Sequence, residues 1–316
     1  MTIAIIGAGL AGLACATSLH AAGQAVALFD KGRGPGGRMS SRRIPTPLGE
    51  ASFDYGAQYF TARDPSFQAC VETWRVAGLV QPWPAAGPDA WVGTPTMNAP
   101  LKHLATTLPI SWNNRIEQIT GHPGHWTLQS EDAPKTAFAT VLLAVPAENT
   151  APLLATLAPS MSAAATATPA QPCWTVMAAF AERLATADDV LREQSTSEPI
   201  GWAARNSAKP GRAGPEAWVI QAGPTWSHTH LEQQPEAIVP ALLEALSTRI
   251  GAPLPPTLTA SAHRWRYARS GALGNGAQSR GALWDQALRI GVCGDWLLGP
   301  RVECAWLSGD QLAKAI

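Results

Sequence analysis

A glycine turn follows the first apolar run of the chain. Gly7, Gly9 and Gly12 stand as GxGxxG in "AIIGAGLAGL". The first glycine permits a tight turn, the second lets backbone amides approach a pyrophosphate, and the third lets a helix pack closely on a strand. Asp30 follows 18 residues after Gly12, where a carboxylate can accept hydrogen bonds from an adenosine ribose. These residues predict a dinucleotide site, and alone they fit FAD and a nicotinamide coenzyme equally.

A second glycine cluster comes directly after that acid, in "DKGRGPGGRMSS". In a nicotinamide site the chain would normally continue toward another helix of the sheet. Here Gly36 and Gly37 let the backbone pass close to a bulky ligand, and Arg38 offers a planar fork of donors to phosphate oxygens. We interpret the cluster as a second contact line on the same dinucleotide, which suits a cofactor that is held permanently.

A third motif comes at the end of the last apolar run, "LRIGVCGDW". Asp295 can accept hydrogen bonds from ribitol hydroxyls. The helix that starts near Arg301 can direct its N-terminus at the pyrimidine edge of an isoalloxazine, where negative charge develops on reduction. The three motifs together favour a flavin over a nicotinamide coenzyme.

Hydrophobic periodicity predicts the elements that position these motifs. The first thirty residues contain a strand, a helix and a strand, which predict a right-handed parallel βαβ unit. Two antiparallel strands, a buried strand stopped by Pro146 and a helix should follow. The residue ranges are 2–6, 10–22 and 25–29 for the first unit, then 111–120, 125–130, 139–146 and 147–157.

Small residues and prolines dominate residues 157–172, which we interpret as a crossing between domains. The next hundred residues predict an antiparallel sheet covered by helix. A final strand and helix should rejoin the first domain, which makes the middle an insertion. The ranges are 173–180, 200–206, 216–223 and 257–268 for the strands of the insertion, 235–250 for its helix, and 288–296 and 301–316 for the last strand and helix.

The predicted fold class is therefore α/β, with a Rossmann-like FAD-binding domain and an inserted antiparallel-sheet substrate domain. We assign residues 1–78, 101–158 and 281–316 to the FAD-binding domain. Residues 79–100 and 159–280 form the predicted substrate domain.

Composition narrows the classes of partner. The chain has 316 residues, with 23 basic and 23 acidic side chains, so no global field attracts nucleic acid or an anionic membrane. The five cysteines form no CxxC pair and no zinc-like spacing, which predicts a reducing compartment and no metal. The N-terminal apolar run lacks a basic leader, and no other segment approaches a membrane span. We expect a cytoplasmic protein without nucleic acid or membrane partners; self-association stays open.

Several stretches together resemble the flavin amine oxidase superfamily, and more closely the bacterial renalases. They are "GAGLAG", "DKGRGPGGRMSS", "FDYGAQYFTARD", "WAARNSAKPGR", "AHRWRYAR", "VCGDW" and "RVECAWLSG". The likeness extends over nearly the whole chain, although the section 81–91 is shorter than the family leads us to expect. It implies a fold of the amine oxidase and p-hydroxybenzoate hydroxylase type.

The resemblance also implies an activity and a set of site residues. Non-covalent FAD would oxidise the 2- or 6-dihydro isomers of NAD(P)H, small-molecule dinucleotides, with O2 reduced to H2O2. The implied cofactor residues are Gly7, Gly9, Ala11, Gly12, Asp30, Lys31, Gly37, Arg38, Gln58, Tyr59, Ile116 in a strand, Asp295, Val302 and Ala305. The candidate substrate residues are Phe60, Thr61, Arg63, Trp202, His263 and Arg301.

The chemistry of such a reaction needs no catalytic acid, base or nucleophile. Hydride transfer from a dihydropyridine leaves an aromatic pyridinium, so the protein has only to orient the ring and exclude water. Flat walls could come from Tyr59, Phe60, Trp202, Trp265 and Tyr267.

Three alternatives stay open. A true amine oxidase would need an aromatic cage and a lysine close to the flavin. Lys209, the one lysine of the insertion, stands in the polar "NSAKPGR", where we expect a surface position. A flavin-binding sensor without turnover would keep the glycine motifs but need no shaped second domain. Covalent flavin through Cys304 is disfavoured against simple packing of a small residue.

Overall fold

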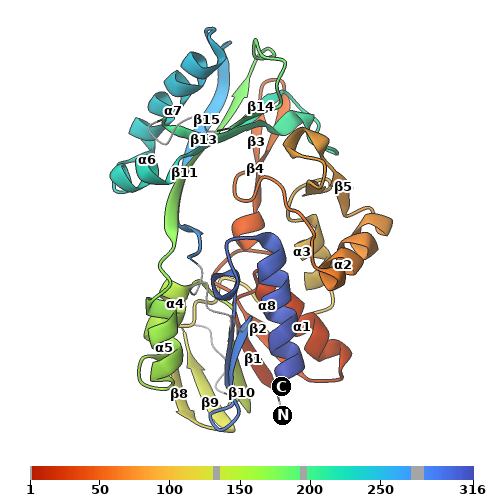
Figure 1. Cartoon of the computed structure of the whole chain (residues 1–316), viewed down its shortest axis with the longest axis vertical. Coiled ribbons are helices and arrows are strands. Elements are labelled where there is room, and N and C mark those ends of the chain that lie inside the picture. Colours follow the sequence, from red (N-terminus) through yellow and green to blue (C-terminus); the bar gives the residue numbers. More distant parts are fainter. Residues whose placement is uncertain (1, 131–135, 193–197, 272–280) are drawn as a thin grey trace.

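The computed structural model describes residues 2–130, 136–192, 198–271 and 281–316. Two sheets form the two halves of the molecule, and the long strands β11 (Gln171–Phe180) and β15 (Thr257–Arg269) extend between them (Figure 1). The glycine motifs belong to the lower half in that view, and the predicted insertion forms the upper half.

The lower half contains a six-stranded, mostly parallel sheet in the order β16-β17-β10-β1-β2-β7. β1 pairs in parallel with β2 and β10, and β10 pairs with β17, so the strand before Asp295 does rejoin the first sheet. Both faces of the sheet are covered, which explains why β1, β10 and β17 are buried throughout and, apart from Thr140, apolar. The strands are β1 (Ile3–Ile6), β2 (Val26–Phe29), β7 (Ile110–Ser111), β10 (Thr140–Leu143), β17 (Ile290–Cys293) and the antiparallel β16 (Ala282–Asp285).

Helices α1 (Leu10–Ala21) and α8 (Val302–Ala315) lie against each other on one face of this sheet. A Cβ built on Gly309 would come within 2.1 Å of the Ala11 carbonyl oxygen, so only glycine permits this approach. The opposite face is covered by α4 (Ala147–Leu154), α5 (Pro159–Thr166) and the hairpin β8 (Gln118–His122)–β9 (His125–Gln129).

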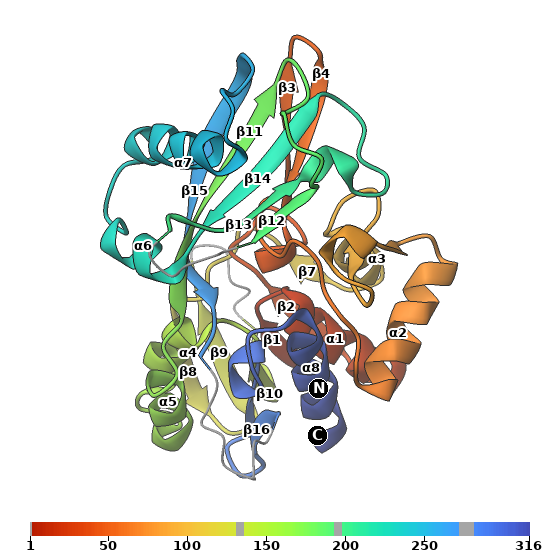
Figure 2. The same cartoon turned by 45° about the horizontal axis from the view of Figure 1, so that its top comes forward.

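The upper half is a five-stranded antiparallel sheet in the order β12-β13-β14-β11-β15 (Figure 2). Its remaining strands are β12 (Val190–Arg192), β13 (Ile200–Arg205) and β14 (Glu216–Ala222). Alternate residues of β11 face opposite sides of the sheet. On one side, Val176 and Phe180 pack with helix α7 (Pro235–Ile250). On the other side, Met177 packs with Phe53 of the hairpin formed by β3 (Ser41–Thr46) and β4 (Gly49–Asp54). Both faces are covered, which explains why β11 is buried from Trp174 to Phe180 and, apart from Thr175, apolar there. A short helix, α6 (Pro224–Thr229), packs beside β11.

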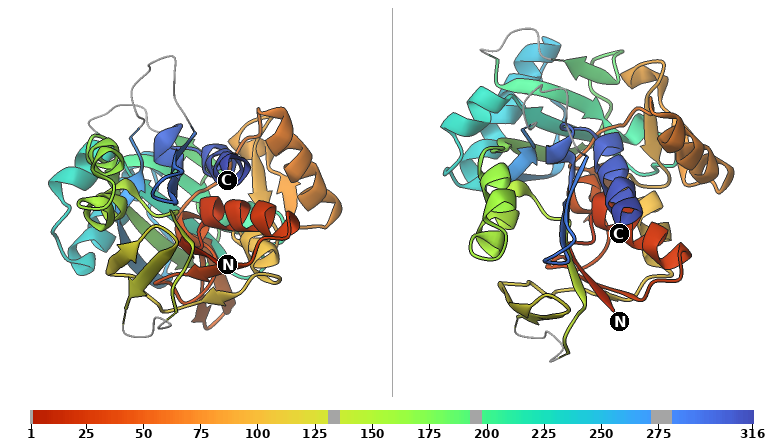
Figure 3. Two further views of the ribbon diagram at one scale, coloured as in Figure 1. Left: turned by 90° about the horizontal axis from the view of Figure 1, so that it is seen from below. Right: turned by 60° about the horizontal axis from the view of Figure 1, so that its bottom comes forward.

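A third group of elements lies on the far side of α1 and α8 from α4 and α5 (Figure 3). It consists of α2 (Pro65–Val76), β5 (Val80–Pro82), β6 (Trp91–Gly93) and α3 (Ala99–Ala105). The buried side chains of Val80, Trp83 and Val92, which we expected in the substrate domain, share one apolar cluster with Leu10 and Leu13 of α1. The predicted domain boundary at 280 falls in 272–280, outside the described residues.

The predicted strand at 111–120 is wrong over its middle. Only β7 and β8 form there, and Ile116 lies between them in irregular chain. The backbone amides of Asn113 and Asn114 donate to the carbonyls of Gly32 and Asp30, at 2.9 and 2.8 Å. The segment therefore follows the corner of the second glycine cluster, and a continuous strand cannot form.

The stretch 157–172, where we expected a crossing between domains, contains a helix, α5, that the prediction lacked, and β11 starts at its end. Pro159 starts the helix, where its missing N–H costs nothing, and the alanines that follow have high helix propensity. Met161 and Ala165 bury the inner face, and Ser162 Oγ donates to the Ala151 carbonyl of α4 at 2.8 Å. Strands β12 and β16 are also absent from the prediction.

Candidate active site

A cavity of about 2060 Å³ lies between the two halves and is lined by both. Ordinary ligand pockets measure roughly 300–1,000 Å³, so this cavity has room for more than one drug-sized ligand. Every predicted cofactor and substrate residue lines it except Gly12. Gly12 lies behind the wall, where a Cβ would come within 1.9 Å of the Gly7 carbonyl oxygen.

The two glycine clusters meet at one wall of the cavity. Gly7 has φ +104° and Gly37 has φ +51°, both in the region that favours glycine. A Cβ built on Gly37 would lie 3.7 Å from Gly9 Cα, and a Cβ on Gly9 would meet no atom within 4 Å. Bare backbone from both clusters therefore borders the same open space, at the N-terminus of α1. This cradle suits the pyrophosphate of a dinucleotide.

Asp30 fixes the corner between the two clusters. Its carboxylate accepts from the backbone amides of Ala8 and Gly32, each at 2.6 Å. The acid thereby holds the first glycine turn to the second, and it lines the cavity where an adenosine ribose is expected.

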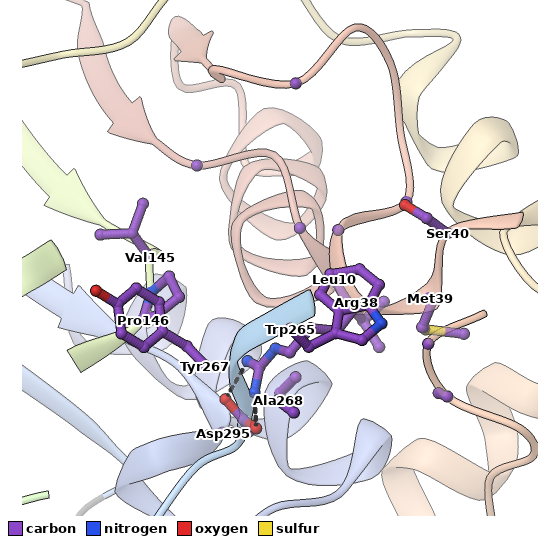
Figure 4. A pocket seen from close by; sticks show the side chains of 18 of the residues that line it. Leu10, Arg38, Met39, Ser40, Val145, Pro146, Trp265, Tyr267, Ala268 and Asp295 are labelled. Atoms are coloured by element: carbon purple, nitrogen blue, oxygen red, sulfur yellow. Dashed lines mark hydrogen bonds and ion pairs between the residues drawn. The ribbon is translucent and has the colours of Figure 1, made fainter. Parts of the chain in front are cut away.

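Arg38 and Asp295 form a bidentate ion pair across the cavity wall (Figure 4). The two nitrogen–oxygen distances are 2.8 and 2.5 Å, and Ser270 Oγ donates to the same carboxylate at 2.6 Å. Arg38, predicted to bind phosphate, and Asp295, predicted to accept from ribitol hydroxyls, therefore form one unit, although 257 residues separate them. This unit orients both groups toward one place in the cavity.

The loop that follows β4 is joined to the Arg38 turn by its backbone. Ala57 N donates to the Arg38 carbonyl at 2.8 Å, and a Cβ on Gly56 would come within 2.0 Å of that oxygen. Tyr59 lines the cavity with Trp202, and their ring centroids are 5.3 Å apart. Phe60 borders the cavity but is 3% exposed, and its ring packs against Phe67. Tyr59 and Trp202 thus form the flat wall, whereas Phe60 belongs mostly to the core.

Lys209 is buried, which corrects the expected surface position. Its Nζ contacts Asp54 Oδ2 at 3.3 Å and Gln58 Oε1 at 3.2 Å, and it lies over the Trp83 ring. Burial lowers the pKa of Lys209 to about 8, against the attraction of Asp54. The sequence signal failed because the polar stretch "NSAKPGR" folds inward against β4.

Asp54 is the centre of this buried cluster and was missed by sequence reasoning. Burial alone would raise its pKa, but Lys209 and Arg212 hold that pKa below its usual range. The carboxylate also accepts from Ser41 Oγ at 2.6 Å and from the Met97 amide at 2.9 Å. Ser41 lines the cavity, so Asp54 positions a wall residue.

Gln58 directs its side-chain amide into this cluster. Its Nε2 donates to the carbonyls of Asp54 and Gly56, and its Oε1 accepts from Lys209. The amide therefore fixes the loop, and only the outer surface of this residue borders the cavity.

Glu303, in the first turn of α8, organises the far end of the cavity. This carboxylate is 2% exposed and accepts from the backbone amides of Arg63 and Asp64, at 2.6 and 2.7 Å. Arg301 pairs with it at 3.2 Å. Arg63 and Arg301, both predicted for substrate, are thus brought together. Cys304 is buried and does not line the cavity.

His263 lies in an aromatic cluster on β15 with Trp265 and with Tyr55, which follows β4. The Tyr55 and Trp265 rings stack at 5.2 Å, and His263 meets both rings edge-on. Burial and then the charge of Arg42 lower the pKa of His263 to about 4. The imidazole is therefore neutral at neutral pH and offers one donor and one acceptor.

The lining of the cavity is strongly basic. Among the described residues, eleven lysine and arginine side chains border it, against three acidic ones. The acidic residues are Asp30, Glu117 and Asp295. The chain as a whole has no net charge, so this positive lining is a local property of the cavity.

In the described part of the chain, no group of three or more His, Cys, Asp or Glu side chains is placed to hold a metal ion. None of the helices there is both long and apolar enough to cross a membrane.

Comparison with protein-family models gives two matches. Residues 5–74 match an NAD(P)-binding Rossmann-like domain, and residues 84–316 match the flavin containing amine oxidoreductases. Both matched segments contribute residues to the lining of the cavity.

Solved structures with the same fold include three oxidases. Their sequence identities to this chain are so low that the likeness establishes a shared fold and not a shared substrate. A putative protoporphyrinogen oxidase from Exiguobacterium is 12% identical with a TM-score of 0.79, over 99% of this chain and 98% of that one. Cyclohexylamine oxidase from Brevibacterium oxydans is 12% identical with a TM-score of 0.74, at the same coverage. A triple mutant of putrescine oxidase is 14% identical with a TM-score of 0.75, over 100% and 99%.

Proposed function

The chain belongs to the flavin containing amine oxidoreductases, and from that premise we propose that it oxidises the 2- or 6-dihydro isomers of NAD(P)H with non-covalent FAD and O2. The family match makes it a flavin-dependent oxidoreductase. The choice of substrate is our proposal, and it combines the resemblance of the sequence motifs to renalases with the charge of the cavity.

The observation that carries the proposal is the excess of basic over acidic side chains around the cavity. Carboxylates pair with four of these cations, namely Arg38, Arg264, Arg266 and Arg301. The other basic side chains of the described lining still outnumber Asp30, Glu117 and the two phosphate charges of FAD together, so positive potential is left for the second ligand. A cleft lined by one sign of charge raises the local concentration of ligands of opposite sign. A dinucleotide is attracted by this lining, whereas a protonated amine is repelled.

The residues of the cavity would have separate roles in this reaction. The Gly9 and Gly37 backbones, with Asp30 and the Arg38–Asp295 unit, would hold FAD. Bound flavin supplies the hydride acceptor and, once reduced, the electrons that convert O2 to H2O2. The chain's own part is to orient the substrate ring against the wall formed by Tyr59 and Trp202 and to exclude water.

The buried position of Lys209 favours the amine oxidase alternative, but this lysine does not face the cavity. Lys209 contacts Asp54 and Gln58 and is absent from the lining. Of the two lysines that do line it, Lys31 follows Asp30 and Lys102 lies on α3, both outside the second sheet. Among the described residues of the lining, none supplies an acidic group beside Tyr59 and Trp202 to attract an aminium ion.

The test is anaerobic mixing of the yellow holoenzyme with candidate substrates while the visible absorbance of oxidised flavin is followed. The panel contains 2-dihydro-NAD, 6-dihydro-NAD, their NADP counterparts, amines including cyclohexylamine and putrescine, and protoporphyrinogen. We expect rapid bleaching by a dihydro isomer and stoichiometric H2O2 when air is admitted.

Bleaching by amines or protoporphyrinogen without bleaching by any dinucleotide isomer would show that the substrate proposal is wrong. A flavin that no compound of the panel reduces favours the sensor alternative. A colourless protein that retains a nicotinamide coenzyme contradicts the cofactor assignment itself.

A further inference from the structure

Arg42 lies in the cavity, but the groups assigned to the cofactor do not account for it. It lies on β3, four residues beyond Arg38, and lines the cavity. Its Cζ is 5.1 Å from the centroid of the Tyr55 ring. The neighbouring Arg43 pairs with Glu50, whereas no acidic side chain in the described part of the chain pairs with Arg42. The cavity therefore contains a guanidinium without a carboxylate partner among the residues that the structure describes.

The aromatic cluster beneath Arg42 holds this guanidinium in place. A cation over an aromatic face is attracted by the ring quadrupole, while its N–H donors stay available to oxygen acceptors. The Tyr55 ring is itself fixed by its stack on Trp265, whose Nε1 donates to the Tyr55 carbonyl at 2.9 Å. Tyr55, Trp265 and His263 all line the cavity. Arg42 is exposed, and its contact with the fixed Tyr55 ring favours one orientation of the fork before any ligand arrives.

The electrostatics of this corner favour an anion. His263 stays neutral at neutral pH because burial and the Arg42 charge keep its pKa near 4. A neutral imidazole adds a donor without adding a charge that must be compensated. Within the described residues, the corner therefore offers the unpaired positive charge of Arg42 and a flat aromatic surface beside it.

The position of Arg42 separates it from the cradle for the cofactor pyrophosphate. That cradle is formed by Gly9, Gly37 and the Arg38–Asp295 unit on the lower half. Arg42 pairs in register with Phe53 of β4, and Phe53 packs on the underside of the second sheet. The guanidinium thus belongs to the part of the cavity bordered by the insertion.

We propose that Arg42, held over Tyr55, binds a phosphate group of the dinucleotide substrate and makes the site selective for phosphorylated substrates. The planar fork matches phosphate oxygens two at a time, and the aromatic cluster can pack against the base of the same ligand. This inference rests on the proposed function for its choice of ligand.

The experiment compares Arg42→Gln and Arg42→Lys with the matched control Arg43→Gln, all as holoenzymes. Each is reduced anaerobically by a dihydro-NAD isomer and by the corresponding dihydronicotinamide riboside, which has no phosphate. We expect Arg42→Gln to raise the dinucleotide concentration that gives half the limiting rate of flavin reduction by about tenfold to a hundredfold. The limiting rate itself should stay unchanged. Arg42→Lys should fall in between, because it keeps the charge but loses the fork.

The riboside concentration that gives half the limiting rate should be the same for the wild type and all three variants. If the dinucleotide concentration for half the limiting rate is the same in Arg42→Gln and Arg43→Gln, the proposal is overturned. So would a loss that is as large for the riboside as for the dinucleotide, since that result marks a structural role.

A binding measurement separates this inference from the proposed function. Calorimetric titration of the oxidised holoenzyme with inorganic pyrophosphate should show binding that Arg42→Gln weakens and Arg43→Gln does not. If no dinucleotide isomer reduces the wild-type flavin, the proposed function fails, and this titration still decides whether Arg42 binds phosphate. FAD retention should be the same in all three variants, and its loss in Arg42→Gln alone would assign Arg42 to the cofactor instead.

Discussion

Single residues around the cavity act mainly by holding one another in place. The Arg38 guanidinium, the Asp295 carboxylate and the Ser270 hydroxyl form one hydrogen-bonded unit. Charge-assisted bonds of this kind contribute more than neutral ones, and an unpaired partner left behind is costly. Arg38 is one-third exposed and Asp295 nearly buried, so the carboxylate depends more on the pair.

Arg38→Ala should weaken FAD retention while the fold stays intact. The change removes a donor from the cofactor wall and leaves Asp295 with Ser270 alone, so we expect the FAD dissociation constant to rise about tenfold to a hundredfold. Flavin release on gel filtration and titration of the apoprotein measure it. Arg75→Ala is the matched control, because Arg75 pairs with Glu72 on the exposed face of α2. Equal retention by both variants would show that Arg38 is only a solvated residue.

His263 should make stability depend on pH in the acid range. Its folded pKa of about 4 lies below the ordinary 6.5, so between these values the unfolded state binds the extra proton. Stability contributed by this group is therefore lost as pH falls from about 6.5 toward 4. His263→Asn should flatten part of that slope in urea unfolding at several pH values. His125→Asn, at an exposed position, should leave the slope unchanged; equal slopes for the wild type and both variants would contradict the assignment.

At the scale of elements, the glycines of the turn between β1 and α1 have two different roles. The Gly7 carbonyl packs directly on Gly12, which lets α1 lie close to β1, whereas Gly9 faces open space in the cavity. Gly309 does for α1 and α8 what Gly12 does for α1 and its own strand. The same kind of residue is thus structural at one position and reserved for a ligand at another.

Alanine at these two positions should give opposite results. Gly12→Ala forces a Cβ into backbone and should cost about 1–3 kcal/mol of unfolding free energy or more. Gly9→Ala meets no atom and adopts an ordinary extended φ of −73°, so the apoprotein should be nearly as stable as the wild type. Its Cβ would occupy the cradle, however, and FAD retention should fall. Denaturant unfolding of the apoproteins and flavin content measure the two effects; full flavin content in Gly9→Ala would argue against the cradle.

At the scale of the whole molecule, buried charges join segments that are distant in the chain. Asp54 ends β4, Lys209 and Arg212 lie in the loop before β14, and Met97 precedes α3. The cluster is nearly inaccessible to solvent and connects the upper sheet to the wall of the cavity through Ser41 and Gln58. The active-site loop therefore depends on contacts made by both halves.

Asp54→Asn should be among the most destabilising single changes in the molecule. It leaves two buried cations without a counter-ion, and breaking a buried pair in this way costs about 3–5 kcal/mol. Lys209→Met should cost less, since Asp54 keeps Arg212. Glu50→Gln, which breaks an exposed pair with Arg43, should change the unfolding free energy by less than about 0.5 kcal/mol. Equal stabilities of Asp54→Asn and Glu50→Gln would show that the cluster is not a structural centre.

The sequence by itself determined the βαβ unit, both glycine clusters, the antiparallel insertion and the return of the last strand. These features depend on backbone freedom at glycine and on periodicity within a few turns, and both are local properties. It also identified part of the lining of the cavity, whereas residues such as Ser41 and Arg42 were not among the predicted ones. Only the tertiary structure decided which of them meet: the Arg38–Asp295 unit, the contact of Gly37 with Gly9, and the inward fold that buries Lys209 on Asp54. Burial and charge pairing depend on elements more than a hundred residues apart, which no local pattern records.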